Sequence, residues 1–380
     1  MILFLLIALL LAAPLQAANI PNAHGCFTGD GIDGKAITTG YCAEDLATFC
    51  TEDVDCGTTC TTFQPDMVWV DQSDVSNQFG TVFTTSDMDA DSSCRLSEGG
   101  TTSADCGANW IQSLTATGFT VGDDNLVNTN GEPYCWSAWK ATADAFAVFK
   151  HTGTGDTTSI ATSFAAKVVG MHKSSGGTAS GLCWRTTDWK DPIGGGGTPT
   201  PTPDPNCLNA NPVRGLDDNR ITAISGSDFT IDTVFDSLGE DFFGFYFGGD
   251  QITVDAFAGD QADATTTEQA IALAAQPLFV WAQGYTSGAA DNTYLCGGWK
   301  TTEDSSGYYF HTASAVDWDR AVKVLNPTPE VRVRNESNAG HPDCNRDSRT
   351  YRVWSSLIGP SPTPTPDPNR RGVARPYLLN

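Results

Sequence analysis

Apolar and polar positions alternate along short stretches of the chain, and turn-forming residues separate these stretches. Residues 134–140 (YCWSAWK) and 145–151 (AFAVFKH) alternate as half-buried strands do, with four small or polar residues between them. Gly, Thr and Asp follow at 153–156, and residues 164–171 form a third candidate strand. The pattern predicts a β-hairpin and a further strand within an all-β chain.

Segments of the same kind recur along the chain, which indicates internal repeats. Residues 109–121 match 219–231 without a gap, residues 64–69 match 276–281, and 241–257 read as another copy of the hairpin. An offset of 160 also pairs identical residues: Tyr134 with Tyr294, Trp139 with Trp299, Lys140 with Lys300, and His151 with His311.

Two stretches of alternating Thr and Pro, residues 194–206 and 359–369, read as linkers. Such segments favour polyproline II, which extends by about 3.1 Å per residue and acts as a semi-rigid spacer. We therefore expect one all-β domain over residues 18–193 and a second over 207–358, although the first linker falls inside a repeat copy. Each domain would then be a permuted pair of half-units. Residues 370–380 read as a disordered tail.

The first residues of the chain predict export. Residues 1–17 combine an unbroken apolar run with small residues at 17 and 18, which is typical of a secretory signal cleaved after Ala17, although the usual preceding Lys or Arg is missing. Elsewhere the chain has no run of roughly 18 apolar residues, so we expect a secreted or cell-surface protein without membrane insertion. The formal charge of −24 makes nucleic acid and anionic membranes poor partners.

The 12 cysteines fit an oxidising compartment. A Cys-rich insertion over residues 42–60 predicts two disulfides of open connectivity, and the alternative is four thiolates around zinc. Two further pairs share a spacing of 48 residues, which suggests that the members of each are bonded. The expected cysteines are Cys42, Cys50, Cys56 and Cys60 in the insertion, Cys94 with Cys106, Cys135 with Cys183, and Cys296 with Cys344, while Cys26 and Cys207 stay unassigned.

Several phrases of the chain together resemble a repeat module of secreted bacterial surface proteins and phage tail-fibre-like proteins. The phrases are FTGDG at 27–31, FQPDM at 63–67, TSDM at 85–88, IQSLTATGFTV at 111–121, VNTNG at 127–131 and YCWSAWK at 134–140. The resemblance covers most of residues 18–193 and the second domain loosely. It implies tandem jelly-roll or lectin-like β-sandwich domains with a role in attachment or surface display. It carries over no catalytic residues.

One acidic turn has the spacing of a calcium loop. Asp87, Asp89 and Asp91 alternate, and Glu98 follows eleven positions after Asp87, so oxygen ligands could wrap one hard cation. Against calcium, Ser92 stands where Gly usually makes the turn. A solvated acidic turn is the alternative.

Tryptophans offer flat apolar faces on which sugar rings could stack. Trp184 and Trp189, close to a loop and a linker, are the candidate ligand-binding residues, and the alternative is that they fill a core. Trp136 and Trp139 must point to opposite faces of their strand, so we expect at most one of them to be core. His151 sits at a strand end without acidic or His partners at recognisable spacing, which favours a structural hydrogen bond.

These features favour a non-catalytic binding or adhesion protein whose partners are glycans or other surface polymers. One alternative is a structural subunit of an extracellular filament or appendage, which would contact copies of itself. A second alternative is an extracellular hydrolase, which would require two carboxylates about 5 to 10 Å apart in a cleft.

Overall fold

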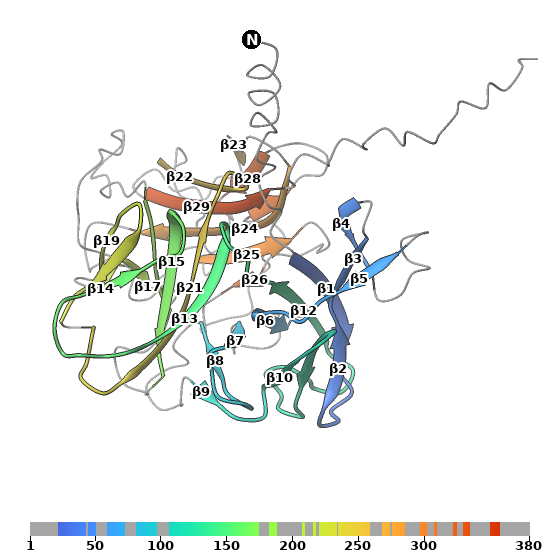
Figure 1. The fold of residues 1–380 in the computed structure, drawn as a ribbon. Helices are drawn as coiled ribbons and strands as arrows, with labels where there is room; N and C mark the ends of the chain where they lie inside the picture. The colour runs from blue at the N-terminus through green and yellow to red at the C-terminus, as the bar shows by residue number, and fades with distance from the viewer. Residues whose placement is uncertain are drawn as a thin grey trace, which may run out of the picture.

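The computed structural model shows an all-β protein whose strands are paired in antiparallel ladders (Figure 1). This confirms the all-β class predicted from the sequence. The structure describes residues 22–42, 45–50, 59–72, 81–96, 106–174, 182–187, 207–209, 216–217, 220–233, 235–258, 268–273, 276–285, 297–301, 308–309, 322–324, 330–334 and 350–357. The expected signal at 1–17, both Thr-Pro stretches and the tail at 370–380 lie outside these residues.

The strands fall into three units, and the first unit spans residues 22–139. Its main sheet has the order β1-β12-β6-β7-β8-β9, and a smaller sheet has the order β10-β11-β2. The bounds are β1 (Asn22–Thr28), β2 (Lys35–Thr38), β6 (Met67–Gln72), β7 (Val82–Thr85), β8 (Ser93–Arg95), β9 (Cys106–Gly107), β10 (Ile111–Thr115), β11 (Gly118–Val121) and β12 (Pro133–Trp139).

The Cys-rich insertion of the first unit forms a sheet of its own with the order β4-β3-β5. Its strands are β3 (Gly40–Cys42), β4 (Asp45–Phe49) and β5 (Cys60–Thr62). In Figure 1 this sheet lies at one flank of the molecule, beside the end of β1.

The second unit spans residues 146–248. Its main sheet has the order β13-β21-β15-β16-β17-β18, and its smaller sheet β14-β20-β19. The bounds are β13 (Phe146–Thr152), β14 (Thr158–Ala161), β15 (Ala166–Lys173), β16 (Cys183–Thr186), β17 (Cys207–Asn209), β18 (Leu216–Asp217), β19 (Ile221–Ile224), β20 (Asp228–Ile231) and β21 (Asp241–Gly248).

The third unit spans residues 252–357. Its main sheet has the order β22-β29-β24-β25-β26, and its smaller sheet β23-β28-β27. The bounds are β22 (Ile252–Ala258), β23 (Glu268–Ala272), β24 (Pro277–Tyr285), β25 (Gly297–Thr301), β26 (Tyr308–Tyr309), β27 (Val322–Val324), β28 (Glu330–Arg334) and β29 (Thr350–Leu357).

All three main sheets are connected alike, because the first strand of each unit pairs with the last, and the last pairs with a strand from the middle. This wiring corrects the expected domain boundary at residues 194–206. β21 follows that stretch along the chain, yet it pairs with β13 and β15, which precede it. The Thr-Pro stretch therefore interrupts one unit instead of separating two domains.

The register of the strands also shows which of the two repeat offsets found in the sequence matches equivalent strands. The offset of 110 carries β10 and β11 onto β19 and β20, and both pairs have a register shift at the same place. The offset of 160 does not follow the sheets. Trp139 lies in β12, the last strand of its unit, whereas Trp299 lies in β25, whose counterpart in the first unit is β7.

The three main sheets contribute to one buried core that is rich in aromatic side chains. The ring centroid of Trp69 lies 5.0 Å from that of Trp139 in its own unit, 5.8 Å from Phe245 in the second unit and 4.9 Å from Trp281 in the third. Burial of such large side chains against one another contributes strongly to stability, so the units are held together by shared packing.

A second core lies between each of the first two main sheets and its smaller sheet. In β12, Trp139 belongs to the shared core and Trp136 to the core of the first unit. The two tryptophans therefore point to opposite faces as expected, but the expectation that at most one is core is wrong. Both faces of the strand are covered, which explains why β6 and β12 read as nearly continuous apolar runs.

Candidate functional site

Trp184, a proposed ligand-binding residue, is fully buried in the shared core. Its place follows from the register, because Trp184 pairs with Gly170 as Phe83 pairs with Trp69 and as Trp299 pairs with Trp281. Trp184 therefore occupies a core position and offers no face to a sugar, which corrects the sequence-based interpretation. Trp189 lies outside the described residues.

Two of these core tryptophans, Trp184 and Trp299, also donate hydrogen bonds to the neighbouring unit. Trp184 Nε1 donates to Gln283 Oε1 of the third unit over 2.6 Å, and Trp299 Nε1 donates to Thr81 Oγ1 of the first unit over 2.9 Å. Thr81 Oγ1 in turn donates to the buried Asp71 over 2.5 Å. Each bond satisfies a polar group inside an apolar core, where an unpaired group would be costly.

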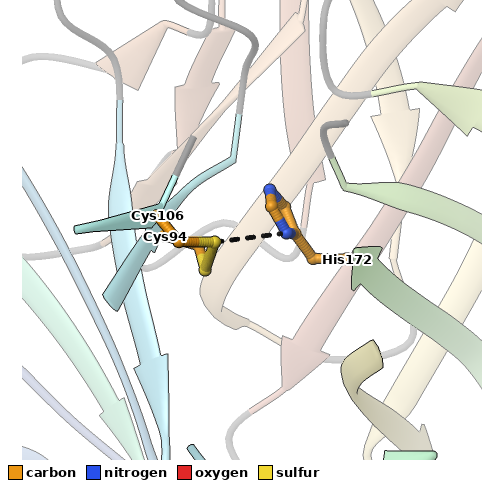
Figure 2. A group of neighbouring side chains, drawn as sticks. All are labelled: Cys94, Cys106 and His172. Carbon is orange, nitrogen blue, oxygen red and sulfur yellow. Dashed lines mark hydrogen bonds between the residues drawn. A yellow bond between two sulfur atoms is a disulfide. The ribbon is translucent and has the colours of Figure 1, made fainter. Parts of the chain in front are cut away.

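The remaining junction, between the first and second units, carries a disulfide and a histidine (Figure 2). Phe83 contacts the His172 ring with centroids 5.5 Å apart, and Cys94 and Cys106 are bonded to each other. The distance from Cys106 Sγ to His172 Nδ1 is 3.9 Å. The three side chains are the one group of metal-ligand type that the described residues bring within 4.8 Å. Burial lowers the pKa of His172 to about 4, so its imidazole is neutral near pH 7.

Among the predicted disulfide pairs, the structure confirms Cys94 with Cys106 and corrects another. Cys135 bonds to Cys26, its cross-strand partner, and Cys183 bonds to Cys207. The two unassigned cysteines are thus the missing partners. In the insertion, Cys50 bonds to Cys60 and Cys42 is also disulfide-bonded, which overturns the zinc alternative for these residues. The predicted cysteines outside the described residues are Cys56, Cys296 and Cys344.

A glycine-rich loop of the first unit is held by one buried asparagine. We call residues 29–34 the first anchored loop. Asn128 accepts from the backbone N–H of Asp30 over 2.9 Å and donates to the carbonyl of Ile32 over 2.9 Å. Asp30 also pairs with Lys35, and the bond from that ammonium lowers the pKa of the Asp30 carboxyl to about 2.

The second unit has a counterpart, residues 153–157, which we call the second anchored loop. Asp236 replaces Asn128 there, and it is fully buried. Its Oδ2 accepts from Thr154 and Thr158 over 2.8 Å each, and its Oδ1 lies 2.7 Å from His151 Nε2. Burial raises the pKa of the Asp236 carboxyl, but these hydrogen bonds outweigh it and the pKa is lowered. His151 therefore has the structural hydrogen bond that its sequence context favoured.

Both anchored loops require glycine at the point where they approach the opposing turn. A Cβ atom on Gly29 would lie 2.1 Å from the Thr129 carbonyl oxygen, and one on Gly153 would lie 2.0 Å from that of Ser237. The same backbone hydrogen bond occurs in both units: the Gly29 N–H donates to the Glu132 carbonyl, and the Gly153 N–H donates to the Glu240 carbonyl. The loops are consequently fixed by backbone contacts as well as by Asn128 and Asp236.

An exposed apolar side chain lies on the first anchored loop, and another lies on the turn that holds the second. Ile32 lies in the first anchored loop and is 64% exposed. Leu238, 78% exposed, lies in the turn 236–240 that holds the second anchored loop. Within the described part of the chain these are the two large hydrophobic side chains that face solvent. Sequence reasoning missed them because a single apolar residue within a turn of polar residues and glycine carries no periodic signal.

The acidic turn does not gather its carboxylates as a calcium loop would. The described residues Asp87, Asp89 and Asp91 form no group within ligand distance of one another, and Glu98 lies outside the described part. Asp91 instead accepts from the backbone N–H of Asn109 over 2.9 Å. Burial, and to a smaller extent the nearby Asp66 carboxylate, raises the pKa of the Asp87 carboxyl. The turn fits the alternative of an acidic surface turn.

No protein-family model matches the chain, and no curated protein matches it. Four disulfides between described cysteines indicate folding in an oxidising, extracellular type of environment. Within the described residues, no helix has the length and apolar character that a membrane crossing requires.

Proposed function

We propose that the protein is a secreted, non-catalytic binding or adhesion protein whose ligand contacts run through the first anchored loop and through the turn 236–240 that holds the second. The observation that carries this proposal is the exposure of Ile32 on the first anchored loop and of Leu238 on the turn 236–240, at the same end of two units but on different segments. Exposed apolar side chains on rigid loops add contact area without a large ordering cost, and they favour recognition of another surface. Two such sites on one molecule would also add by avidity.

The ligand class that we propose is a glycan or another surface polymer, as the resemblance to surface-display modules implies. The chemistry of the polar groups supports binding over catalysis. Both oxygens of Asp236 are occupied by internal donors, and His151 is bonded to the same carboxylate. The residues that most resemble a catalytic pair therefore serve to hold a loop.

The test is the double variant Ile32→Asn with Leu238→Asn, compared with Thr157→Asn, which changes an exposed polar residue of the second anchored loop. Binding to an array of glycans and surface polymers would be measured for all three proteins. We expect the double variant to lose at least tenfold in affinity and the control to bind like the wild type. Equal binding by the double variant would overturn the role of the loops.

Light scattering on the same proteins distinguishes this proposal from the alternative that the protein is a structural subunit of a filament. A purified wild type that stays monomeric while it binds the array agrees with the proposal. If instead the wild type forms polymers and the double variant does not, the exposed side chains contact other copies of this chain, and the protein is a structural subunit.

A further inference from the structure

We propose that Cys94, Cys106 and His172 form a zinc site that opens when their disulfide is reduced. The three residues come from three strands, β8, β9 and β15, and they meet where the first unit packs against the second (Figure 2). Two thiolates and one imidazole are the donors that Zn²⁺ prefers in proteins.

The distances already fit such a site once the S–S bond is broken. Zinc holds thiolate sulfur at about 2.3 Å and imidazole nitrogen at about 2.0 Å, so tetrahedral angles separate sulfur and nitrogen by about 3.5 Å. Cys106 Sγ and His172 Nδ1 are 3.9 Å apart. A shift of a few tenths of an ångström therefore brings His172 into range, while the two sulfurs move apart.

The charge balance suits a buried position. Cys94 and His172 are buried, and Cys106 is partly exposed, which leaves a route for the reductant and the ion. Two thiolates cancel the charge of Zn²⁺, and the neutral imidazole adds none, so the occupied site has no net charge to desolvate. Solvent reaching Cys106 would supply the fourth ligand.

The corresponding positions at the junction of the second and third units carry none of these ligands. By register, Leu208 takes the place of Cys94 and pairs with Leu216, as Cys94 pairs with Cys106. Gln283 stands two residues after Trp281, where His172 stands two residues after Gly170. The set of two cysteines and one histidine is thus absent from the junction of the second and third units.

The chemical step balances with a dithiol reductant. Two electrons and two protons pass from the dithiol to the Cys94–Cys106 bond, which breaks into two thiols while the reductant closes to its own disulfide. Zn²⁺ then binds, and both thiol protons leave to solvent.

The experiment is a zinc titration after limited reduction with a dithiol, read out by a chromophoric chelator that competes for the metal. Alkylation and peptide mapping show which cysteines are free, and near-ultraviolet circular dichroism shows whether the aromatic core persists. Co²⁺ serves as a spectroscopic probe, since thiolate ligation gives charge-transfer absorption. The variants are Cys94→Ser with Cys106→Ser, and His172→Gln, which places the residue found at position 283.

We expect the reduced wild type to bind one more Zn²⁺ than the reduced double-serine variant, and His172→Gln to weaken that extra site by 10-fold to 100-fold. A Cys183→Ser with Cys207→Ser variant should keep the extra zinc. Equal stoichiometry in the wild type and the double-serine variant would overturn the proposal. Unchanged affinity in His172→Gln would do the same, as would loss of the aromatic circular dichroism when this disulfide alone is reduced.

Discussion

Two buried side chains, Asn128 and Asp236, hold corresponding loops with different chemistry. In the first unit the neighbouring strand residue is Phe27, which stacks on Tyr134 with centroids 5.5 Å apart. In the second unit His151 stands there, and its partner is the carboxylate of Asp236. A buried charge is tolerated only where donors surround it, so the acid accompanies the histidine and the two threonines.

Asp236→Asn should destabilise the protein by about 1.5 to 3 kcal/mol, because an amide nitrogen would face donors that now bond to a carboxylate. Urea unfolding near neutral pH measures this loss. Asp156→Asn, an exposed acid of the same loop, is the matched control and should change stability by less than about 0.5 kcal/mol. A variant at position 236 as stable as the control would contradict the account of the anchored loop.

His24 provides a second test at the residue scale. It occupies the register position of Val148 and Val254, and its ring lies 6.4 Å from Phe279 of the third unit. Burial lowers the pKa of His24 to about 3. Between that value and the unfolded pKa near 6.5, the unfolded chain binds the proton and the folded chain does not, so stability falls as the pH falls.

From about pH 7 to about pH 4.5, His24 alone should remove about 2 to 3 kcal/mol of stability. His24→Val, which installs the residue of the other two units, should make the pH dependence shallower by that amount. Urea unfolding of both proteins at the two pH values measures the difference. The same pH slope in both would show that His24 does not set it.

At the scale of elements, the second anchored loop approaches the turn 236–240 so closely that Gly153 should not tolerate a larger side chain. Gly153→Ala should cost about 1 to 3 kcal/mol or more, since its Cβ would meet a backbone oxygen that has little room to move. Gly226→Ala is the control, because nothing lies within 4 Å of its Cβ position. Thermal unfolding should separate the two variants, and equal midpoints would refute the steric argument.

Strands were easier to predict than their partners. The alternation of residues 134–140 correctly placed Trp136 and Trp139 on opposite faces, because side-chain direction in a strand depends on local geometry alone. The pairing of Cys135 with Cys26 could not be read from spacing, since it depends on which strand lies beside β12. The grouping of His172 with Cys94 depends on contacts between units and leaves no local signal.

At the scale of the whole molecule, cutting the chain within residues 194–206 should not separate its halves. β21 pairs with both β13 and β15, and the Cys183–Cys207 disulfide connects the two sides of the cut. An inserted protease site allows the test by gel filtration, with and without reductant. One peak at the uncut mass is expected in both conditions, and two smaller species after reduction would restore the picture of two separate domains.

The Thr-Pro stretch misled the domain prediction for a physical reason. Such composition indicates a solvated, extended backbone, and that property is shared by domain linkers and by long insertions within a domain. Only the pairing of strands on either side distinguishes the two. In this sequence the informative observation was that the Thr-Pro stretch interrupts a repeat copy. A unit with strands before and after the stretch must pair them with each other, so the stretch is an insertion within that unit.

The three junctions give the fold an evolutionary freedom that a homotrimer lacks. Three separate identical subunits would have to place the same residue at every junction, and any substitution would appear three times. Here one chain forms all three junctions, and each has its own chemistry: an indole with an amide, an indole with a hydroxyl and a carboxylate, and an imidazole beside a disulfide. A single mutation can therefore alter one junction while the other two keep the molecule assembled.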